Sequence, residues 1–406
     1  MQTVELPHVA VDPYSTEVLT DPLPFWEEVR EAGPVVRVDQ SLGYDIVAVG
    51  RDAELRELHV RNDLFISGRG AGILDRTKGE SFREPAILLE SDQPDHTAVR
   101  SVIGEILAPR NLRRLRQTFA EAADTIVDLA LEKGLADAQT DLAEAFPLRV
   151  IPDAVIGAPP EGRENLLRYS TFLFESLGPQ TERARAEIAA VGDLAAVQEW
   201  IRASCARDAV ARGTVGGAIW EAADAGKFTP DQAANLVRSL LGAGIDTTIH
   251  SIAYTLFHLA THPGEYAKLV ADPRRAKFAY EESLRLDSVV RQNYRTPARD
   301  TEIGGIPIRE GQKVMLLVAS ANRDPRRWGP TVDRYDIDRT SEDGHMTFGR
   351  GIHQCIGQPI ARMEAEALIG AVARKVATIE LTGEPVPMLN NTLRGFRSLP
   401  VRLTAA

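Results

Sequence analysis

Hydrophobic positions recur at helical spacing through most of the chain. Apolar residues three or four positions apart predict helices over residues 24–32, 94–107, 112–133, 193–212, 230–262, 275–286 and 358–376. Alternation of apolar and polar positions, which is typical of strands, is confined to short stretches at residues 35–38, 44–49, 313–317 and 401–403. The pattern therefore predicts a mainly α fold with small β-sheets.

Composition indicates one large folded unit. The 406 residues are 44% hydrophobic and 26% charged, which is typical of a globular protein with a large core. No linker rich in proline, glycine or serine and no repeat of fixed period is present. We therefore expect residues 1–406 to form a single domain.

Charge and hydropathy narrow the range of partners. The formal net charge is −11, whereas nucleic acids and anionic membranes are bound through basic surface. No apolar run approaches the roughly 18 residues of a membrane helix, and residues 1–5 lack the basic and apolar regions of a signal peptide. We expect a cytoplasmic protein with no nucleic-acid or membrane partner, which leaves a small molecule and a protein partner.

The two cysteines lie in dissimilar settings. Cys205 and Cys355 are far apart in the chain, so a disulfide framework is not expected. Cys205 falls within the predicted helix 193–212 and is assigned to packing. Cys355 lies in the glycine-rich run FGRGIHQCIG, residues 348–357, which leads directly into the predicted helix 358–376.

Cys355 has the setting of a thiolate metal ligand. A cysteine just before a helix lies near unpaired backbone N–H groups and the positive end of the helix dipole, which favour the thiolate. Gly349, Gly351 and Gly357 have no Cβ, so a flat macrocycle can lie close to the loop. A haem iron bound by cysteine thiolate is suited to cleaving the O–O bond.

The spacing of Phe348, the three glycines, His353 and Cys355 resembles the haem-binding signature of the cytochrome P450 family. This resemblance implies the cytochrome P450 fold and a monooxygenase, an oxidoreductase that uses O2. It also implies heme b, iron protoporphyrin IX, with Cys355 as the axial iron ligand and with Phe348 and Gly349 beside the cofactor.

The same resemblance extends to a charged network. Glu282 and Arg285 are three residues apart, so they share one face of the predicted helix 275–286. Together with Arg339 they resemble the family's Glu-Arg-Arg network, and we expect all three to be structural residues. An isolated E-x-x-R spacing would otherwise indicate only an ordinary surface ion pair.

A haem brings two propionates, and buried carboxylates require hydrogen-bonded cationic partners. His96 and Arg100 are one helical turn apart, Arg295 follows the Glu282 helix, and His353 stands two residues before Cys355. All four resemble propionate contacts of the family.

A second chemical centre lies within the predicted helix 230–262. Gly242 and Gly244 each cost roughly 1 kcal/mol relative to alanine in a helix interior, which suggests that room is needed there. Asp246 and Thr247 resemble the family's acid–alcohol pair. The resemblance implies that Thr247 hydrogen-bonds the bound oxygen and that Asp246 relays protons.

Electrons are expected to come from another protein. No dinucleotide or flavin signature is present, and no length remains for a fused reductase. The resemblance therefore implies an iron-sulfur ferredoxin with a separate ferredoxin reductase. Arg100, Arg350 and Arg362 are candidates for the basic docking surface.

Longer runs, at residues 6–8, 237–241, 320–328 and 390–395, resemble the bacterial P450 subfamily that oxidises para-substituted benzoates. This resemblance implies hydroxylation or O-demethylation of a small aromatic acid. The substrate contacts that it implies are Arg83, Leu89, Phe174, Arg238, Ser239, Gly242 and Asn293.

The chain also departs from this subfamily. Residues 83–86 are Arg-Glu-Pro-Ala where the subfamily has Arg-Pro-Pro-Ser, and Gly242, Leu177 and Asn293 replace a serine and two phenylalanines. A wider or more polar pocket is expected, and anchoring of a carboxylate stays open because Arg83 could instead pair with Glu84. Two alternatives therefore remain: the same chemistry on a neutral phenol or aryl ether, and a non-catalytic haem-thiolate binding or sensor protein.

Overall fold

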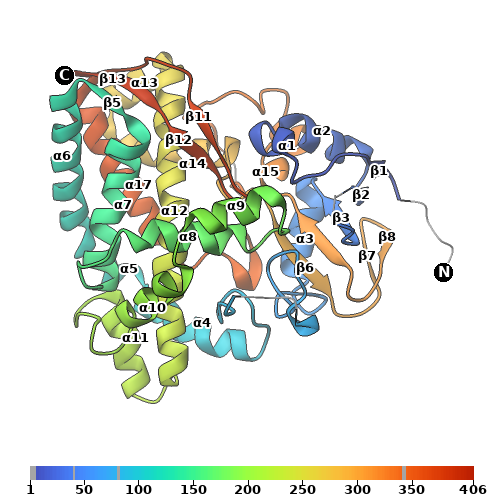
Figure 1. Ribbon diagram of the computed structural model, residues 1–406. Coiled ribbons are helices and arrows are strands. Elements are labelled where there is room, and N and C mark those ends of the chain that lie inside the picture. The colour runs from blue at the N-terminus through green and yellow to red at the C-terminus, as the bar shows by residue number, and fades with distance from the viewer. Residues whose placement is uncertain (1–5, 40–41, 80–82, 341–343) are drawn as a thin grey trace.

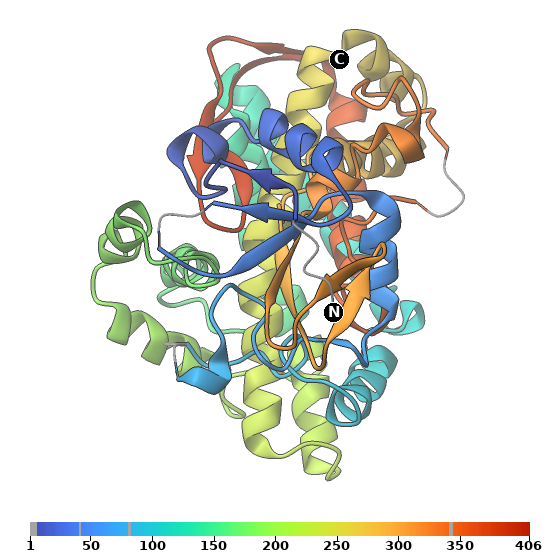
Figure 2. The ribbon, with the colours of Figure 1, turned by 90° about the vertical axis from the view of Figure 1, so that its right-hand side faces the viewer.

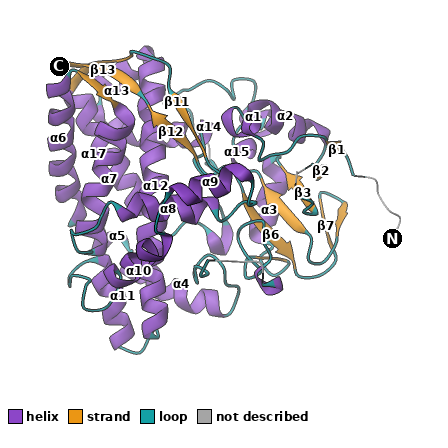
Figure 3. Ribbon diagram, in the orientation of Figure 1, coloured by secondary structure: helices purple, strands orange, loops and turns teal. Residues whose placement is uncertain are grey.

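The computed structural model describes residues 6–39, 42–79, 83–340 and 344–406. Residues 1–5, on which the expectation of no signal peptide rests, lie outside these ranges. Helices fill one side of the molecule, and most of the strands lie on the other side, near the N-terminus (Figures 1 and 3).

The helices account for most of the regular structure, as the periodicity predicts. They are α1 (Thr16–Thr20), α2 (Leu23–Ala32), α3 (Asp52–Val60), α4 (Asp95–Ile106), α5 (Pro109–Leu112), α6 (Leu115–Lys133), α7 (Ala145–Val150), α8 (Asn165–Glu175), α9 (Glu182–Ala190), α10 (Leu194–Ser204), α11 (Val215–Asp224), α12 (Pro230–Thr261), α13 (Pro263–Ala271), α14 (Ala276–Leu286), α15 (Val318–Ala321), α16 (Pro325–Trp328) and α17 (Gln358–Lys375). Two π-helical segments, Ala138–Glu144 and Ile151–Ile156, flank α7.

The strands form small sheets. They are β1 (His8–Val9), β2 (Val36–Val38), β3 (Ile46–Val49), β4 (Phe65–Ile66), β5 (Leu135–Asp137), β6 (Asn293–Pro297), β7 (Thr301–Ile303), β8 (Ile306–Ile308), β9 (Lys313–Leu316), β10 (Val376–Leu381), β11 (Val386–Leu389), β12 (Arg394–Ser398) and β13 (Pro400–Ala405). A mixed sheet has the order β1-β2-β3-β9-β6-β4, a second has the order β10-β13-β5, and β11-β12 and β7-β8 form two hairpins.

Two predicted helices differ from the structure. The segment 193–212 is helical only as far as Ser204, because the chain then turns back and the Ala211 N–H bonds the Gly157 carbonyl at 2.9 Å. The segment 112–133 is interrupted between α5 and α6. In both places periodic apolar residues continue through a turn, so periodicity alone does not locate the end of the helix.

The long helix α12 is the central element of the fold. Thr229 caps it through a capping box with Gln232, and Pro230 occupies its first turn, so its start is determined locally. It contacts α8, α14, α17 and the π-helical segment Ala138–Glu144, and Figure 2 shows it running through the middle of the molecule. Because α12 is packed on several sides, its different faces point into different parts of the protein interior.

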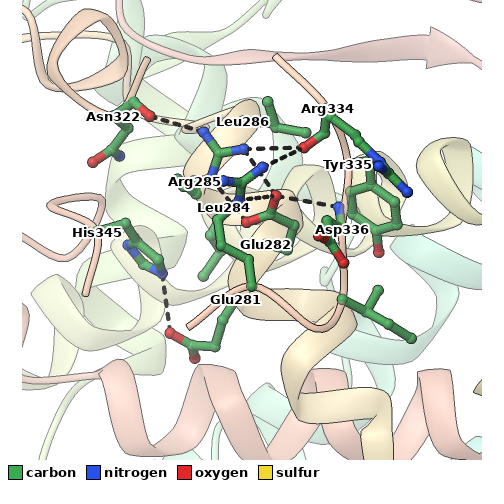
Figure 4. A network of polar contacts seen from close by, with 12 residues as sticks. Glu281, Glu282, Leu284, Arg285, Leu286, Asn322, Arg334, Tyr335, Asp336 and His345 are labelled. Carbon is green, nitrogen blue, oxygen red and sulfur yellow. Dashed lines mark hydrogen bonds and ion pairs between the residues drawn. The ribbon is translucent and has the colours of Figure 1, made fainter. Parts of the chain in front are cut away.

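The Glu282 network ties α14 to the cysteine loop (Figure 4). Arg285 is almost fully buried and donates to both carboxylate oxygens of Glu282 at 2.8 Å, and Arg339 donates to Glu282 Oε1 at 2.9 Å. The Arg285 guanidinium also donates to the Asn322 carbonyl at 3.1 Å, and the Asn322 side chain accepts from the Met346 N–H at 2.7 Å. These contacts connect the network with the start of the loop that carries Cys355, as a structural role requires.

Among the described residues, no helix has both the length and the apolar content needed to cross a membrane.

Candidate active site

The conformation of the cysteine loop, residues 348–357, is fixed by a hydrogen bond within its own backbone and by close contact with α3. The Cys355 N–H donates to the Phe348 carbonyl at 2.7 Å, and Gly349 and Gly351 have φ values of 67° and 69°. A Cβ on Gly351 would lie 2.1 Å from the His59 carbonyl oxygen, so that position requires glycine. The loop thus holds Cys355 at the start of α17, as the sequence predicts.

The Cys355 thiol faces a cavity and not the outer surface. Burial raises the pKa of Cys355, whereas the backbone N–H groups of Gly357 and Gln358 and the charges of Arg100 and Arg362 lower it. The helix N-terminus therefore favours the thiolate, as the sequence predicts, but burial has the larger and opposite effect on the pKa. A metal ion bound to the sulfur would supply the missing stabilisation, because a coordinated thiol is deprotonated.

The cavity that Cys355 lines has a volume of about 280 Å³ and mainly apolar walls. Its walls come from α4, α8, α12, α17 and the cysteine loop, and they include Arg100, Phe174, Thr247, Phe348 and His353. A Cβ on Gly244 would meet nothing within 4 Å, so the middle of α12 leaves open space above the cysteine. Gly244 therefore provides the room that the sequence predicts.

His353, which lines this cavity, belongs to a group of side chains with buried nitrogen atoms that also includes His96 and Arg295. The rings of His96 and His353 lie 4.4 Å apart, and among the described residues neither ring nitrogen of either histidine has a hydrogen-bond partner. Burial lowers the pKa of His353 to about 3 and that of Arg295 to about 10. Arg295 donates to the Tyr294 carbonyl at 2.8 Å. Buried donors of this kind require an acceptor from outside the chain.

These residues fit a haem with two propionates. The thiol of Cys355 would ligate the iron, and the unpartnered His96 and His353, with Arg100 and Arg295, would donate to the carboxylates. Phe348 lines the cavity and is covered by the Arg362 guanidinium at 4.6 Å.

The two residues of the acid–alcohol pair face different compartments. Thr247 lines the cysteine cavity, and its hydroxyl donates to the Ala243 carbonyl at 2.7 Å. Asp246 lines a separate cavity of about 270 Å³, here called the polar hollow, together with Gln139, Glu144 and His250. Consecutive helix positions differ by about 100° in direction, which places the two side chains on different faces of α12.

Asp246 lies in an unusual environment within the polar hollow. Burial raises the pKa of Asp246 to about 7, opposed by the nearby Ser170 hydroxyl and reinforced by the Glu144 carboxylate. Among the described residues, Asp246 Oδ1 and Ser170 Oγ have no hydrogen-bond partner. A buried acid with a pKa near neutrality can both accept and release a proton under physiological conditions.

Comparison with known proteins agrees with this geometry. The family model "Cytochrome P450" matches residues 213–276 and 277–402. Cytochrome P450 CYP199A2 from Rhodopseudomonas palustris is 45% identical over 404 residues, covering 99% of this chain and 95% of that protein. The chain belongs to the cytochrome P450 family. Cytochrome P450 monooxygenase PikC from Streptomyces venezuelae is 31% identical over 392 residues, covering 94% of this chain and 91% of that protein.

Solved structures confirm the P450 fold. CalO2 superimposes with a TM-score of 0.81 at 27% identity, covering 97% of this chain and 99% of that chain. The cytochrome P450 CREJ in complex with (4-ethylphenyl) dihydrogen phosphate has a TM-score of 0.85 at 24% identity, covering 98% and 99%. The chain is therefore a P450 monooxygenase, and the family implies a haem with cysteine thiolate ligation, O2 and an external source of electrons.

The polar end of the P450 cavity contains two arginines, each with a carboxylate partner. Arg83 forms an ion pair with the fully buried Glu90, and Arg238 forms one with Glu84. Arg83 thus forms an ion pair with the Glu90 carboxylate, and it also donates to the backbone carbonyl of Glu84 at 3.3 Å. The backbone N–H groups of Ala71 and Ala86 also donate to Glu90, each at 3.1 Å.

The other predicted substrate contacts divide into two groups. Leu89, Phe174 and Ser239 line the cavity with Arg83 and Arg238. Gly242 and Asn293 do not belong to its lining, which corrects the expectation for both. A Cβ on Gly242 would lie 3.0 Å from the Tyr169 ring, so Tyr169 covers this glycine, and Asn293 lies at the start of β6, paired with Leu316 of β9.

Several residues that line the cavity were not predicted, among them Tyr169 and Glu364. Tyr169 of α8 fills the space beside Gly242, and only the tertiary structure brings the two together. Glu364 of α17 is buried, and neither carboxylate oxygen has a partner among the described residues, so burial raises its pKa well above the usual range. Its position between Ile360 and Leu368, on the apolar face of the predicted helix, was a signal available in the sequence.

The predicted arginines for ferredoxin docking, Arg100, Arg350 and Arg362, are each only partly exposed. Arg362 donates to both oxygens of Glu281, at 2.6 and 3.1 Å, and Arg100 lines the cavity. Arg100 and Arg362 thus have roles inside the protein.

The remaining expectations concern residues outside the cavity. Cys205 is buried, and burial raises its pKa to about 12, as expected for a packing residue. The ring of His258 donates to the Asp287 carboxylate at 2.7 Å and stacks on Tyr335, so it has a structural role.

Proposed function

We propose that this P450 inserts one oxygen atom of O2 into a small aromatic acid, by hydroxylation or O-demethylation at the end opposite the carboxylate. The observation that carries the proposal is the polarity of the cavity. Apolar walls lead from Cys355 and Thr247 at one end to Arg238 and Ser239 at the other. A flat aromatic molecule with one polar end would be oriented by such a gradient.

The proposed cofactor is heme b. Cys355 would ligate the iron, and His96, Arg100, Arg295 and His353 would bind the propionates. When bound, it supplies the reductive activation of O2. The protein residues then orient the substrate and move protons.

Proton transfer is assigned to the acid–alcohol pair. The hydroxyl of Thr247 lies on the cavity side of α12, where it can donate to an oxygen above the cysteine. The carboxyl of Asp246 lies on the polar hollow and, with a pKa raised to about 7, can take up protons from that side. The pair would link the two compartments through the helix.

The proposed electron donor is an iron-sulfur ferredoxin with a separate ferredoxin reductase. This part rests on the absence of a reductase signature in the sequence.

The second candidate substrate is a neutral phenol or aryl ether. It is favoured by one observation, namely that the guanidinium groups of Arg83 and Arg238 are both ion-paired within the protein. A neutral polar group would meet these pairs without breaking them.

A titration of the ferric holoprotein tests the proposal. We expect 4-methoxybenzoate to shift the Soret band toward the high-spin form, and turnover with a ferredoxin and reductase to release formaldehyde. A shift with methyl 4-methoxybenzoate alone would favour the neutral substrate. Spectral binding without product under reducing conditions would indicate a sensor.

A further inference from the structure

The two ion pairs at the polar end of the cavity differ in how firmly they are held. Both partners of the Arg83–Glu90 pair are buried, and two backbone N–H groups also hold Glu90. Removing one partner from such a pair is strongly destabilising, so Arg83 belongs to the scaffold.

The Arg238–Glu84 pair is different. The Arg238 side chain is 11% exposed, whereas the Glu84 side chain is 58% exposed. Ion pairs with one exposed partner contribute little to stability, and a carboxylate in contact with water can leave its partner at low cost. Arg238 is therefore the arginine of this cavity that an incoming anion could engage.

The backbone beside Glu84 is fixed to α12. Asn235, three residues before Arg238, donates to the Pro85 carbonyl at 2.8 Å and accepts from the Ile87 N–H at 3.1 Å. Glu84 therefore stays within reach of Arg238 even when its carboxylate turns toward water. Because Glu84 is held next to Arg238, its carboxylate is present at a high effective concentration and readily re-forms the ion pair.

Among the described residues, Arg83 and Arg238 at this end are each paired with a carboxylate, that of Glu90 and that of Glu84. A substrate carboxylate that binds Arg238 must displace Glu84 or lie beside a second negative charge. An amide or hydroxyl of the same size meets neither obstacle. The Ser239 hydroxyl in the cavity lining donates to Asn235 Oδ1 at 3.3 Å and can still accept a hydrogen bond from such a group.

We infer that Glu84 is a specificity-determining residue that competes, as an internal carboxylate, with substrate carboxylates for Arg238. This inference rests on the proposed function, because it concerns the same cavity. It assigns the relative affinity of this P450 for anionic and neutral aromatic ligands to one residue at the cavity edge.

The test compares two ligands of nearly equal shape, 4-methoxybenzoate and 4-methoxybenzamide, with the ferric holoprotein. Dissociation constants are obtained from the Soret shift and checked by calorimetry. We expect Glu84→Gln to tighten binding of the acid about tenfold and to leave that of the amide unchanged. Equal changes for both ligands, or no change for the acid, would overturn the inference.

Two further variants make the result specific. Glu380→Gln is the matched control, because Glu380 also pairs with an arginine, Arg402, and its side chain is also 58% exposed. It should change neither constant. In an Arg238→Gln background, Glu84→Gln should no longer tighten binding of the acid, since the competition has been removed. A gain that persists there would contradict a role through Arg238.

An iron-ligating pair of probes separates this inference from the proposed substrate. The acid 4-(imidazol-1-yl)benzoate and its amide bind through the imidazole nitrogen whether or not benzoates are substrates. If the methoxy compounds cause no shift, the proposed substrate class is wrong. The role of Glu84 is then tested with the two imidazole ligands. The Glu84→Gln variant should bind the imidazolyl acid more tightly than the wild type does and should bind the amide with unchanged affinity.

Discussion

The two faces of α12 carry opposite environments within one turn of helix. The Thr247 face borders the largely apolar cavity above Cys355, and the Asp246 face borders the polar hollow with Glu144 and His250. Because neighbouring positions on a helix point about 100° apart, two adjacent residues can serve two compartments. Under the proposed function, oxygen chemistry and proton supply would lie on separate sides of the helix.

The largest expected effect comes from replacing Cys355, which should abolish turnover and leave the environment of Asp246 in the polar hollow unchanged. Cys355→Ser removes the thiolate ligand, so we expect loss of the thiolate-type spectrum of the reduced carbon monoxide complex and loss of turnover. The polar hollow shares no residue with the cysteine loop, so Asp246 should keep its raised pKa, which infrared spectroscopy of its carboxyl group measures. A large change in that pKa would show that the two sides are not independent.

The next effect distinguishes the acid from the alcohol. Asp246→Asn should slow electron consumption and product formation together by about 100-fold, because proton supply is lost. Thr247→Ala should leave the rate of electron consumption closer to normal, but more of the electrons should end in hydrogen peroxide, because the proton is no longer delivered at the correct place. Rates of reductant use, peroxide and product measure both, with Thr247→Ser as the control that keeps the hydroxyl. Identical behaviour of the two variants would contradict the division of roles.

Stability should depend on pH through the hollow side. Asp246 has an ordinary pKa of 3.8 when unfolded and a pKa of about 7 when folded, so between these values the folded protein holds an extra proton. The contribution of Asp246 to stability is therefore fully present below about pH 4 and is lost as the pH rises through about 7. Between about pH 4 and 7, the free energy of unfolding of Asp246→Asn should rise relative to that of the wild type, by a few kcal/mol at most. Denaturant unfolding at several pH values measures this difference. If the free energies of unfolding of the variant and the wild type changed with pH in parallel, the prediction would be wrong.

The smallest effect lies within the polar hollow. The carboxylate of Glu144 raises the pKa of Asp246, so Glu144→Gln should lower that pKa by a fraction of a pH unit. Glu187 also lines the hollow but pairs with Arg397 at 2.6 Å, so Glu187→Gln is the matched control with a weaker effect. Infrared titration of the Asp246 carboxyl measures both. An equal response to the two variants would mean that Glu144 has no special position.

The cysteine loop could be predicted because its signals are local. Phe348, Gly351 and Cys355 lie within a few residues of each other, and the helix that follows begins where the sequence predicts. The Glu282–Arg285 pair is also local, three residues apart on one helix. For such motifs, sequence spacing and spatial distance are nearly the same quantity.

The polar end of the cavity could not be predicted in the same way. Arg83 was expected to bind substrate or to pair with Glu84, but its partner is Glu90, seven residues later. Glu84 instead meets Arg238, which is 154 residues away. Several acids are near Arg83 in sequence, and only the path of the segment before α4 decides which one reaches it.

The sequence by itself determined the mainly α architecture, the position of Cys355 before α17 and the position of Asp246 and Thr247 within α12, because helical periodicity and motif spacing are encoded in neighbouring residues. Only the tertiary structure decided that Asp246 faces a separate hollow, that Tyr169 covers Gly242, and that Glu84 neutralises Arg238. The physical reason is that burial and charge pairing depend on which distant segments pack together, and that choice is made by the whole core.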